Sequence, residues 1–227
     1  MPSILNDHAE AVRPKLYNRH MIVSHTHKFV FAAVPKTGTH SVRQALRDHL
    51  GEEDAEQVGL FVNKRFPWQE LAEIKHGHLS LQQLRPHLGE EDFQAYFKFA
   101  FVRNPYDRFV SYCAFMTRDT PHFKTSPQNV MRFFLFEEPR ENHILFRPQN
   151  ELLVDEAGEL LTDYVGRVEE MQASYDTICE RIGIPTAVLG KVNSSERGDY
   201  RSYYNDELRA GVEARYGKDI ELFGYSF

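Results

Sequence analysis

The fold of this chain is decided by one stretch, FVFAAVPKTGTHS, which occupies residues 29–41. Residues 29–34 carry no charge, as expected of a strand that is buried on both faces of a sheet. Pro35 ends this apolar run, and the apolar spacing from Val42 to Leu50 then favours a helix. We therefore predict a strand, a short polar loop and a helix in direct succession.

The loop in this stretch has the composition of a phosphate-binding site. Gly38 lets the backbone approach a ligand closely, and the backbone amides that open the next helix attract anions. The common ATP- and GTP-binding loop has a first glycine and ends in Gly-Lys-Ser/Thr. Here Lys36 precedes Gly38 and the first glycine is missing. The loop predicts a phosphate ligand other than ATP or GTP, and a plain strand-to-helix turn with a surface lysine is the alternative.

A second unit of the same kind begins with FKFAFV at residues 97–102, which reads as another buried strand. The turn RNPYD follows, and we expect Asp107 to cap a helix over Arg108–Thr117. Two such units imply an α/β fold in three layers, with a central parallel sheet flanked by helices, similar to P-loop folds. Ligands bind at the carboxyl ends of the strands in such folds, where both loops fall.

Arg103 and Ser111 are candidates for a second phosphate site. A guanidinium binds phosphate through two parallel hydrogen bonds, and a serine hydroxyl adds a third. The alternative is a structural ion pair for Arg103 and a position on the helix surface for Ser111.

Length and composition indicate the domain organisation, the partners and the location of the protein. A chain of 227 residues buries a sizeable core, and we expect one domain over residues 1–227, with an N-terminal extension at 1–27 and a core at about 28–225. The net charge of −6 argues against a nucleic-acid partner. Cys113 and Cys179 match no metal or redox spacing, so we expect reduced core thiols. Scattered charges before Lys28 argue against a signal peptide or membrane span. If the chain is complete, we expect a cytoplasmic protein.

The remaining elements follow from periodicity, caps and turn residues. We predict a strand at Val58–Val62, a helix at Trp68–Ile74, a helix capped by Ser80 through His87, a loop at Gly89–Asp92, a helix from Pro127 to Phe136, a hairpin at residues 152–161, a strand at Tyr164–Val168, a helix at Glu169–Ile182 that ends at Gly183, and a last helix at Asp206–Tyr216 that ends at Gly217.

Both phosphate motifs resemble those of one enzyme family. The pattern Pro-Lys-x-Gly-Thr-x-Ser at residues 35–41 resembles the 5′-phosphosulfate loop of sulfotransferases, which use 3′-phosphoadenosine 5′-phosphosulfate (PAPS). FVRNPYDRFVSY at 101–112 resembles their 3′-phosphate motif, in the form of the carbohydrate branch with the uronosyl 2-O- and chondroitin 4-O-enzymes. Weaker blocks at 143–149, 165–169 and 219–225 extend the resemblance over about residues 29–225. Eukaryotic members of that branch are typically Golgi proteins with a membrane anchor, so this chain resembles a bacterial relative or a trimmed domain.

The resemblance implies which residues hold the cofactor, whose product is 3′,5′-ADP. Arg103 and Ser111 would bind the 3′-phosphate. Cytosolic members close that site with Arg-Lys-Gly, and the nearest match here is Arg197-Gly198, which lacks the lysine. Ser41 replaces a tryptophan of the cytosolic members. The residues implied around the 5′-phosphosulfate are Pro35, Lys36, Thr37, Gly38, Thr39, His40 and Ser41.

A histidine between the two motifs is the candidate base. HGHLS at residues 76–80 resembles the His-Gly-His segment of the uronosyl 2-O-sulfotransferases. Imidazole suits removal of a hydroxyl proton near neutral pH, so we expect His78 as the base and His76 as an alternative base or helper. Lys36 would stabilise the charge that develops on the bridging oxygen. The paired histidines lack a third ligand at a recognised spacing, and we expect no metal.

The expected reaction is transfer of a sulfuryl group from PAPS to a hydroxyl acceptor, for which a glycan or glycolipid is the leading expectation. The net negative charge favours a neutral or mildly acidic glycan. Two alternatives remain: a non-catalytic nucleotide- or glycan-binding module of the same fold, and a nucleotide kinase. The kinase needs Mg²⁺ chemistry, for which the standard Gly-Lys-Ser/Thr is missing. The acceptor position and the oligomeric state stay open.

Overall fold

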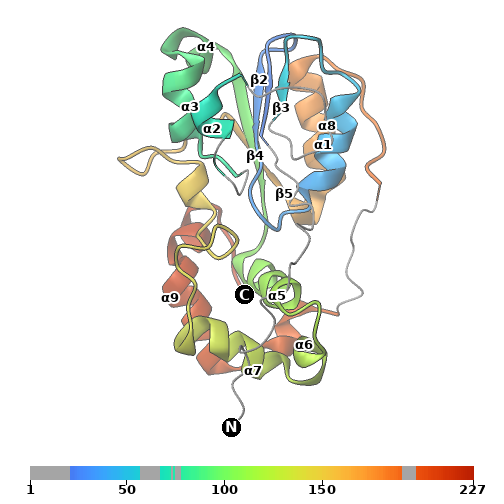
Figure 1. Cartoon of the computed structure of the whole chain (residues 1–227). Helices are drawn as coiled ribbons and strands as arrows, with labels where there is room; N and C mark the ends of the chain where they lie inside the picture. The colour runs from blue at the N-terminus through green and yellow to red at the C-terminus, as the bar shows by residue number, and fades with distance from the viewer. Residues whose placement is uncertain (1–20, 57–66, 73, 75–77, 191–197) are drawn as a thin grey trace.

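The structure, a computed structural model, describes residues 21–56, 67–72, 74, 78–190 and 198–227. Its sheet has the strand order β3-β1-β2-β4-β5 (Figure 1). The strands are β1 Ile22–Ser24, β2 Phe29–Ala32, β3 Ala55–Glu56, β4 Phe97–Val102 and β5 Tyr164–Arg167. Strands β2, β4 and β5 are parallel, whereas β1 is antiparallel to both β2 and β3. The α/β prediction is confirmed, with a parallel centre inside a mixed sheet.

Strand β1 lies in the segment that the sequence assigns to an N-terminal extension. It pairs with β2 as a hairpin, with Val23 opposite Val30, and Lys28 in the turn has the left-handed φ of 50°. The apolar run at residues 21–23 is too short to predict a strand from the sequence. The segment forms a strand because it pairs with β2. The sheet therefore begins before residue 28.

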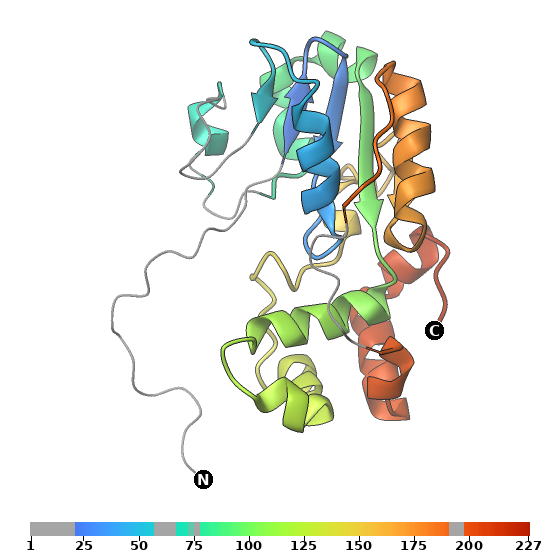
Figure 2. The same cartoon turned by 90° about the vertical axis from the view of Figure 1, so that its right-hand side faces the viewer.

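The two buried faces of the sheet follow from the alternation of side chains along β2 and β4. Phenylalanines 29, 31, 99 and 101 lie in the hydrophobic cluster shared with helices α1 (Thr39–Arg47) and α8 (Met171–Ile182). Residues 30, 32, 100 and 102 lie in the other cluster, with α3 (Leu81–Leu88) and α4 (Glu90–Ala95). These helices cover opposite faces (Figures 1 and 2), so the three predicted layers are present.

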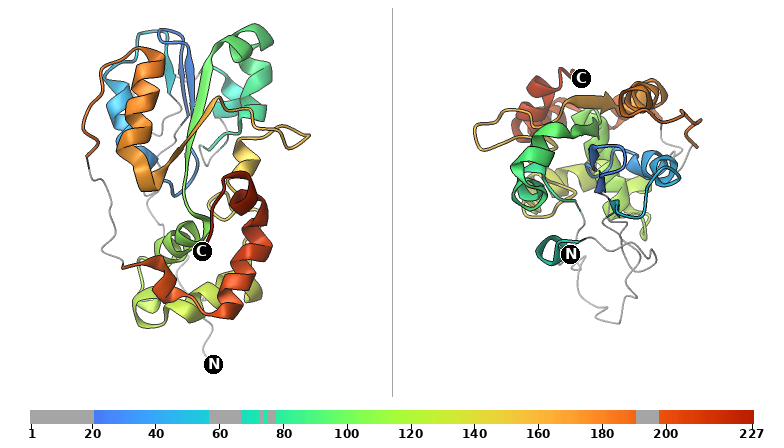
Figure 3. Two further views of the ribbon diagram at one scale, coloured as in Figure 1. Left: turned by 180° about the vertical axis from the view of Figure 1, so that it is seen from behind. Right: turned by 90° about the horizontal axis from the view of Figure 1, so that it is seen from above.

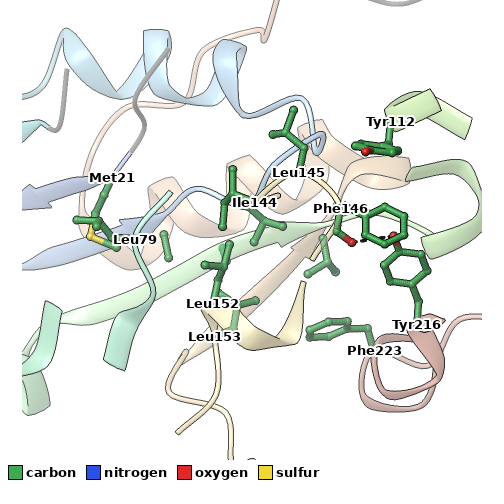
Figure 4. Close-up of a cluster of buried hydrophobic side chains, with 14 of the residues drawn as sticks. Met21, Leu79, Tyr112, Ile144, Leu145, Phe146, Leu152, Leu153, Tyr216 and Phe223 are labelled. Atoms are coloured by element: carbon green, nitrogen blue, oxygen red, sulfur yellow. Dashed lines mark hydrogen bonds between the residues drawn. The ribbon is translucent and has the colours of Figure 1, made fainter. Parts of the chain in front are cut away.

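A group of helices lies beyond the carboxyl ends of the parallel strands (Figures 1 and 3). It contains α5 Pro105–Met116, α6 His122–Thr125, α7 Pro127–Arg132, the π-helical turn η1 Phe133–Glu137 and α9 Asp206–Leu222. Its aromatic core joins the second cluster (Figure 4), where the Tyr216 hydroxyl donates to the carbonyl of Phe146 at 2.8 Å. The core of the sheet thus continues into the helices next to the predicted phosphate loops.

Other sequence predictions have mixed outcomes. Ser80 caps α3 in a capping box with Gln83, and α8 ends at Gly183, both as predicted. Residues 89–92 are wrong as a loop, because α4 begins at Glu90 with three acidic residues in its first turn. The predicted strand at 58–62 lies outside the described residues. The remaining short elements are α2 Gln69–Ala72, η2 Asn150–Leu152, η3 Val168–Glu170 and η4 Tyr200–Tyr203, and residues 154 and 160 form the bridge of the predicted hairpin.

The last helix is longer than predicted. Gly217 does not end α9, which continues to Leu222 past a non-helical Tyr216. Glycine costs a helix only about 1 kcal/mol, which the burial of the Tyr216 ring and the hydrogen bonds of the buried Asp219 offset. Cys113 and Cys179 are both buried thiols, as predicted. None of the described helices is long and apolar enough to cross a membrane.

Candidate functional site

The loop after β2 turns sharply into α1 through two left-handed residues. Lys36 has a φ of 66° and Gly38 a φ of 65°. The buried Thr37 hydroxyl donates to the carbonyl of Val34 at 2.8 Å, and the Ser41 hydroxyl lies 3.3 Å from the carbonyl of Gly38. These local bonds hold the predicted phosphate loop in one shape.

Gly38 is required at this position for two reasons. Its φ disfavours a side chain, and a Cβ there would lie 2.9 Å from Cε of Met171, the first residue of α8. Gly38 is also the N-cap of α1, and no side chain of the described residues caps that helix. The first amides of α1 therefore have the properties of an anion site.

Arg108 holds the start of this loop through a hydrogen bond to its backbone. Its Nε donates to the carbonyl of Pro35 at 3.0 Å, and its Nη2 donates to the carbonyls of Leu145 and Arg147 at 3.3 and 3.0 Å. Burial lowers the pKa of this arginine. Sequence reasoning missed this role, although one arginine among the apolar residues of α5 was a signal for it.

Arg103 connects the two predicted phosphate loops. It follows β4, and its Nε and Nη2 lie 2.7 and 2.6 Å from Oδ2 of Asp107. Its Nη1 donates to the backbone carbonyl of Lys36 at 3.3 Å. Arg103 therefore forms an ion pair with Asp107, the alternative that the sequence left open. It also donates a hydrogen bond to the other phosphate loop.

Asp107 is not the helix cap that the sequence predicts. Helix α5 begins at Pro105, and the side chain of Asn104 accepts from the amide of Tyr106 at 3.0 Å. Proline favours the first helical position, which moves the start three residues upstream of the prediction. The Asp107 carboxylate is thereby free to pair with Arg103 in the first turn.

Ser111 lies six residues after Pro105 on α5, about 9 Å of helix rise. It is buried, with an exposed fraction of 5%, so it is not on the helix surface. Among the described residues, no hydrogen bond joins its hydroxyl to Arg103. Arg103 thus lies in the turn before α5, and Ser111 lies within the helix.

His78 lies at the end of β2 although it is far from this strand in sequence. Its Nδ1 is 2.8 Å from the carbonyl of Ala33. A carbonyl only accepts, so Nδ1 carries the proton and the lone pair of the neutral ring is on Nε2. The ring is buried, and this bond fixes its tautomer and orientation next to the loop.

Lys36 and His40 complete the described part of the loop. The ammonium of Lys36 lies 4.1 Å above the ring of Phe115 on α5. His40 lies in the first turn of α1 and its Nδ1 is 3.2 Å from Nη2 of Arg43.

The other predicted site residues lie elsewhere. Gly198 is exposed, and a Cβ at its position would meet no described atom within 4 Å. His76 and Arg197 lie outside the described residues.

The turn at Arg103 is supported by residues that the sequence did not single out one by one. The Gln149 side chain accepts from the amide of Arg103 at 3.0 Å and donates to its carbonyl at 2.9 Å. The fully buried Asp219 accepts from the amides of Gln149 and Asn150 at 2.7 and 2.8 Å, and from the Asn150 side chain. Residues of the weaker blocks at 143–149 and 219–225 therefore meet behind this turn.

A third weak block has a similar role. Glu169 accepts from the amide of Asn104 at 2.8 Å and from the hydroxyl of Tyr225 at 3.0 Å. Asn104 also donates to the carbonyl of Ser226 at 2.9 Å. These bonds connect the ends of β4 and β5 to the segment after α9.

In the described part of the chain, no three His, Cys, Asp or Glu side chains gather as a metal site.

Asp219 gives a test of this support. We expect Asp219→Asn to lower the free energy of unfolding by about 2–4 kcal/mol, because the new amide group faces N–H donors that lose their acceptor. Urea unfolding measures this, and Glu221→Gln on the exposed side of α9 is the control, expected within about 0.5 kcal/mol of the wild type. Equal stabilities of the two variants would contradict the supporting role of Asp219.

The chain is similar to one protein family. The model of the Sulfotransferase family matches residues 19–226, which include the sheet and both loops. The chain matched none of the curated proteins and none of the solved structures. The family match covers most of the chain, so the protein belongs to the Sulfotransferase family.

Proposed function

We propose that this protein transfers the sulfuryl group of PAPS to a hydroxyl of a carbohydrate, with His78 as the base. Membership of the family supports sulfuryl transfer in general. The observation that carries the finer proposal is the bond from Arg103 to the carbonyl of Lys36, because it brings the two loops together at the carboxyl ends of neighbouring parallel strands.

The residues present fit such a nucleotide. Gly38 and the start of α1, which no described side chain caps, suit the 5′-phosphosulfate, with Pro35 and Thr37 in the loop and Thr39 and Ser41 in the first turn of the helix. A guanidinium has five N–H groups, and the described partners of Arg103 use only part of them. Arg103 therefore retains donors for a 3′-phosphate. In this proposal Ser111 adds a hydroxyl, and Gly198 belongs to the segment that closes the site.

The bound cofactor supplies the sulfuryl group and leaves as 3′,5′-ADP. In the proposed step, Nε2 of His78 takes the proton of the acceptor hydroxyl while the hydroxyl oxygen forms a bond to sulfur. The bond from sulfur to the bridging oxygen breaks, and its electron pair stays on the phosphate. Lys36 moves from the ring of Phe115 to donate to that oxygen as its charge grows.

The charge of the chain bears on the class of acceptor. A net charge of −6 favours a neutral or mildly acidic glycan or glycolipid over a densely sulfated polymer. We further propose that residues 1–227 act as one domain, because the family match spans residues 19–226.

Calorimetric titration with 3′,5′-ADP, 5′-AMP and ATP tests the cofactor. We expect 3′,5′-ADP to bind at least about tenfold more tightly than 5′-AMP, because Arg103 adds charged hydrogen bonds to the 3′-phosphate. Arg103→Ala removes this preference. Arg209→Ala, which breaks another arginine–carboxylate pair of i,i+4 spacing on α9, keeps it.

Each other outcome of the titration has a defined meaning. Equal affinities of the wild type for 3′,5′-ADP and 5′-AMP would contradict the proposal, and magnesium-dependent preference for ATP would favour the kinase. Selective binding of 3′,5′-ADP without sulfation of any glycan in a broad panel would favour a non-catalytic module.

A further inference from the structure

The ring of His40 is held by an arginine of its own helix. His40 lies in the first turn of α1, and Nη2 of Arg43 is 3.2 Å from its Nδ1. A guanidinium only donates, so Nδ1 accepts and the neutral ring carries its proton on Nε2. Arg43 therefore selects one tautomer of His40.

Arg43 is itself fixed by the edge of the sheet. Its exposed fraction is 2%, and its Nε lies 3.3 Å from the buried carboxylate of Glu56 on β3. Nε of Arg47 lies 2.7 Å from the same carboxylate. Two arginines of α1 thus share the carboxylate of Glu56. Burial, and then the charge of Arg47, lower the pKa of Arg43 to about 10.

The surroundings of His40 disfavour its charged form. Burial first, then the positive charges of Arg43 and Arg47, lower the pKa of His40. Glu56 of β3 is bonded to these two arginines, and α8 packs the uncharged Met171 against the loop. As pH falls, His40 therefore stays neutral to a lower pH than an ordinary histidine.

We propose that Arg43 is a positioning residue, which presents His40 to the 5′-phosphosulfate as an uncharged Nε2–H donor. This inference rests on the proposed function. An uncharged donor binds the phosphosulfate oxygens without adding a fixed positive charge. Transfer increases the negative charge of the leaving group, and a fixed cation would hold the product more tightly than an uncharged donor does. Lys36 is then the cation of the loop that follows the developing charge.

The ligand-free protein allows a first test, by ¹⁵N NMR of labelled histidine. We expect the wild-type His40 ring to carry its proton on Nε2, and a proton on Nδ1 would overturn the proposal without the need for any variant. In Arg43→Met the ring should lose this single tautomer and its pKa should rise. Arg47→Met is the matched control, because Arg47 binds Glu56 but makes no described hydrogen bond to the ring.

Calorimetry with 3′,5′-ADP at pH 7.5 and pH 5.5 is the second test. We expect Arg43→Met to bind about three- to tenfold more weakly than the wild type at pH 7.5, where one aligned donor and a nearby charge are lost. The variant should recover affinity at pH 5.5, as His40 becomes charged, by about threefold or more beyond the change in Arg47→Met. The phosphates titrate equally in both variants, and Arg47→Met also removes one charge that lowers the pKa of His40, so the difference reports what Arg43 adds through its hydrogen bond and its own charge.

The outcomes separate this inference from the proposed function. Equal pH dependence of Arg43→Met and Arg47→Met, with 3′,5′-ADP still preferred by the wild type, would overturn the role of Arg43 alone. If the wild type shows no preference for 3′,5′-ADP over 5′-AMP, the proposed function fails, and with it the role of His40 toward the nucleotide.

Discussion

Replacement of His78 by alanine is expected to lower turnover by about 10²- to 10⁴-fold, the usual contribution of a general base. The bond from Nδ1 to the carbonyl of Ala33 places the lone pair on Nε2, and the variant loses this proton acceptor. The affinity for 3′,5′-ADP should stay within about threefold of the wild type, because the nucleotide contacts in the proposal come from other residues. Turnover is read as formation of 3′,5′-ADP from PAPS with the best acceptor of a glycan panel.

His27→Ala is the matched control for this experiment. The His27 ring also bonds to a backbone carbonyl, that of His49 at 3.1 Å, but it lies before β2 rather than after it. Its loss should leave turnover almost unchanged. If His78→Ala retains wild-type turnover, the base is another group, and His76 becomes the first residue to replace.

The two phosphate loops could be predicted because their signals are local. An uncharged apolar run that stops at Pro35, and a glycine just after it, specify strand and turn without any distant partner. The strand at residues 97–102 was predicted to the residue for the same reason. The start of α5 has two competing local signals, since Asn104 and Asp107 are both good caps and only the proline between them favours Asn104.

The support of the site could not be predicted because it depends on pairs that are distant in sequence. Asp219 meets Gln149, and Glu169 meets Asn104, across about 65 to 70 residues. No periodicity or spacing reports such a pair, and a buried carboxylate looks like any other acidic residue until the fold is known. The bond of His78 to Ala33 is of the same kind, so its proximity to the loop was an expectation from resemblance rather than from pattern.

Lys36→Met is expected to lower turnover by about 10²- to 10³-fold, the usual effect of removing one group that stabilises developing charge. The Lys36 backbone has a left-handed φ of 66°, and methionine bears the same backbone cost as lysine, so the loop keeps its shape. The resting ammonium lies over Phe115 in the ligand-free protein. The affinity for 3′,5′-ADP should therefore fall much less than turnover does, by about tenfold or less.

Lys28→Met provides an unusually close control for this loss. Lys28 is also a lysine with a left-handed backbone, at a φ of 50°, but it lies in the turn before β2, at the opposite end of the strand from Lys36. If backbone strain or net charge governed activity, the two variants would lose turnover to the same extent. Loss in Lys36→Met alone assigns the effect to an ammonium at the carboxyl end of β2. Parallel loss of turnover and 3′,5′-ADP affinity would instead make Lys36 a binding residue with no particular role in the transfer step.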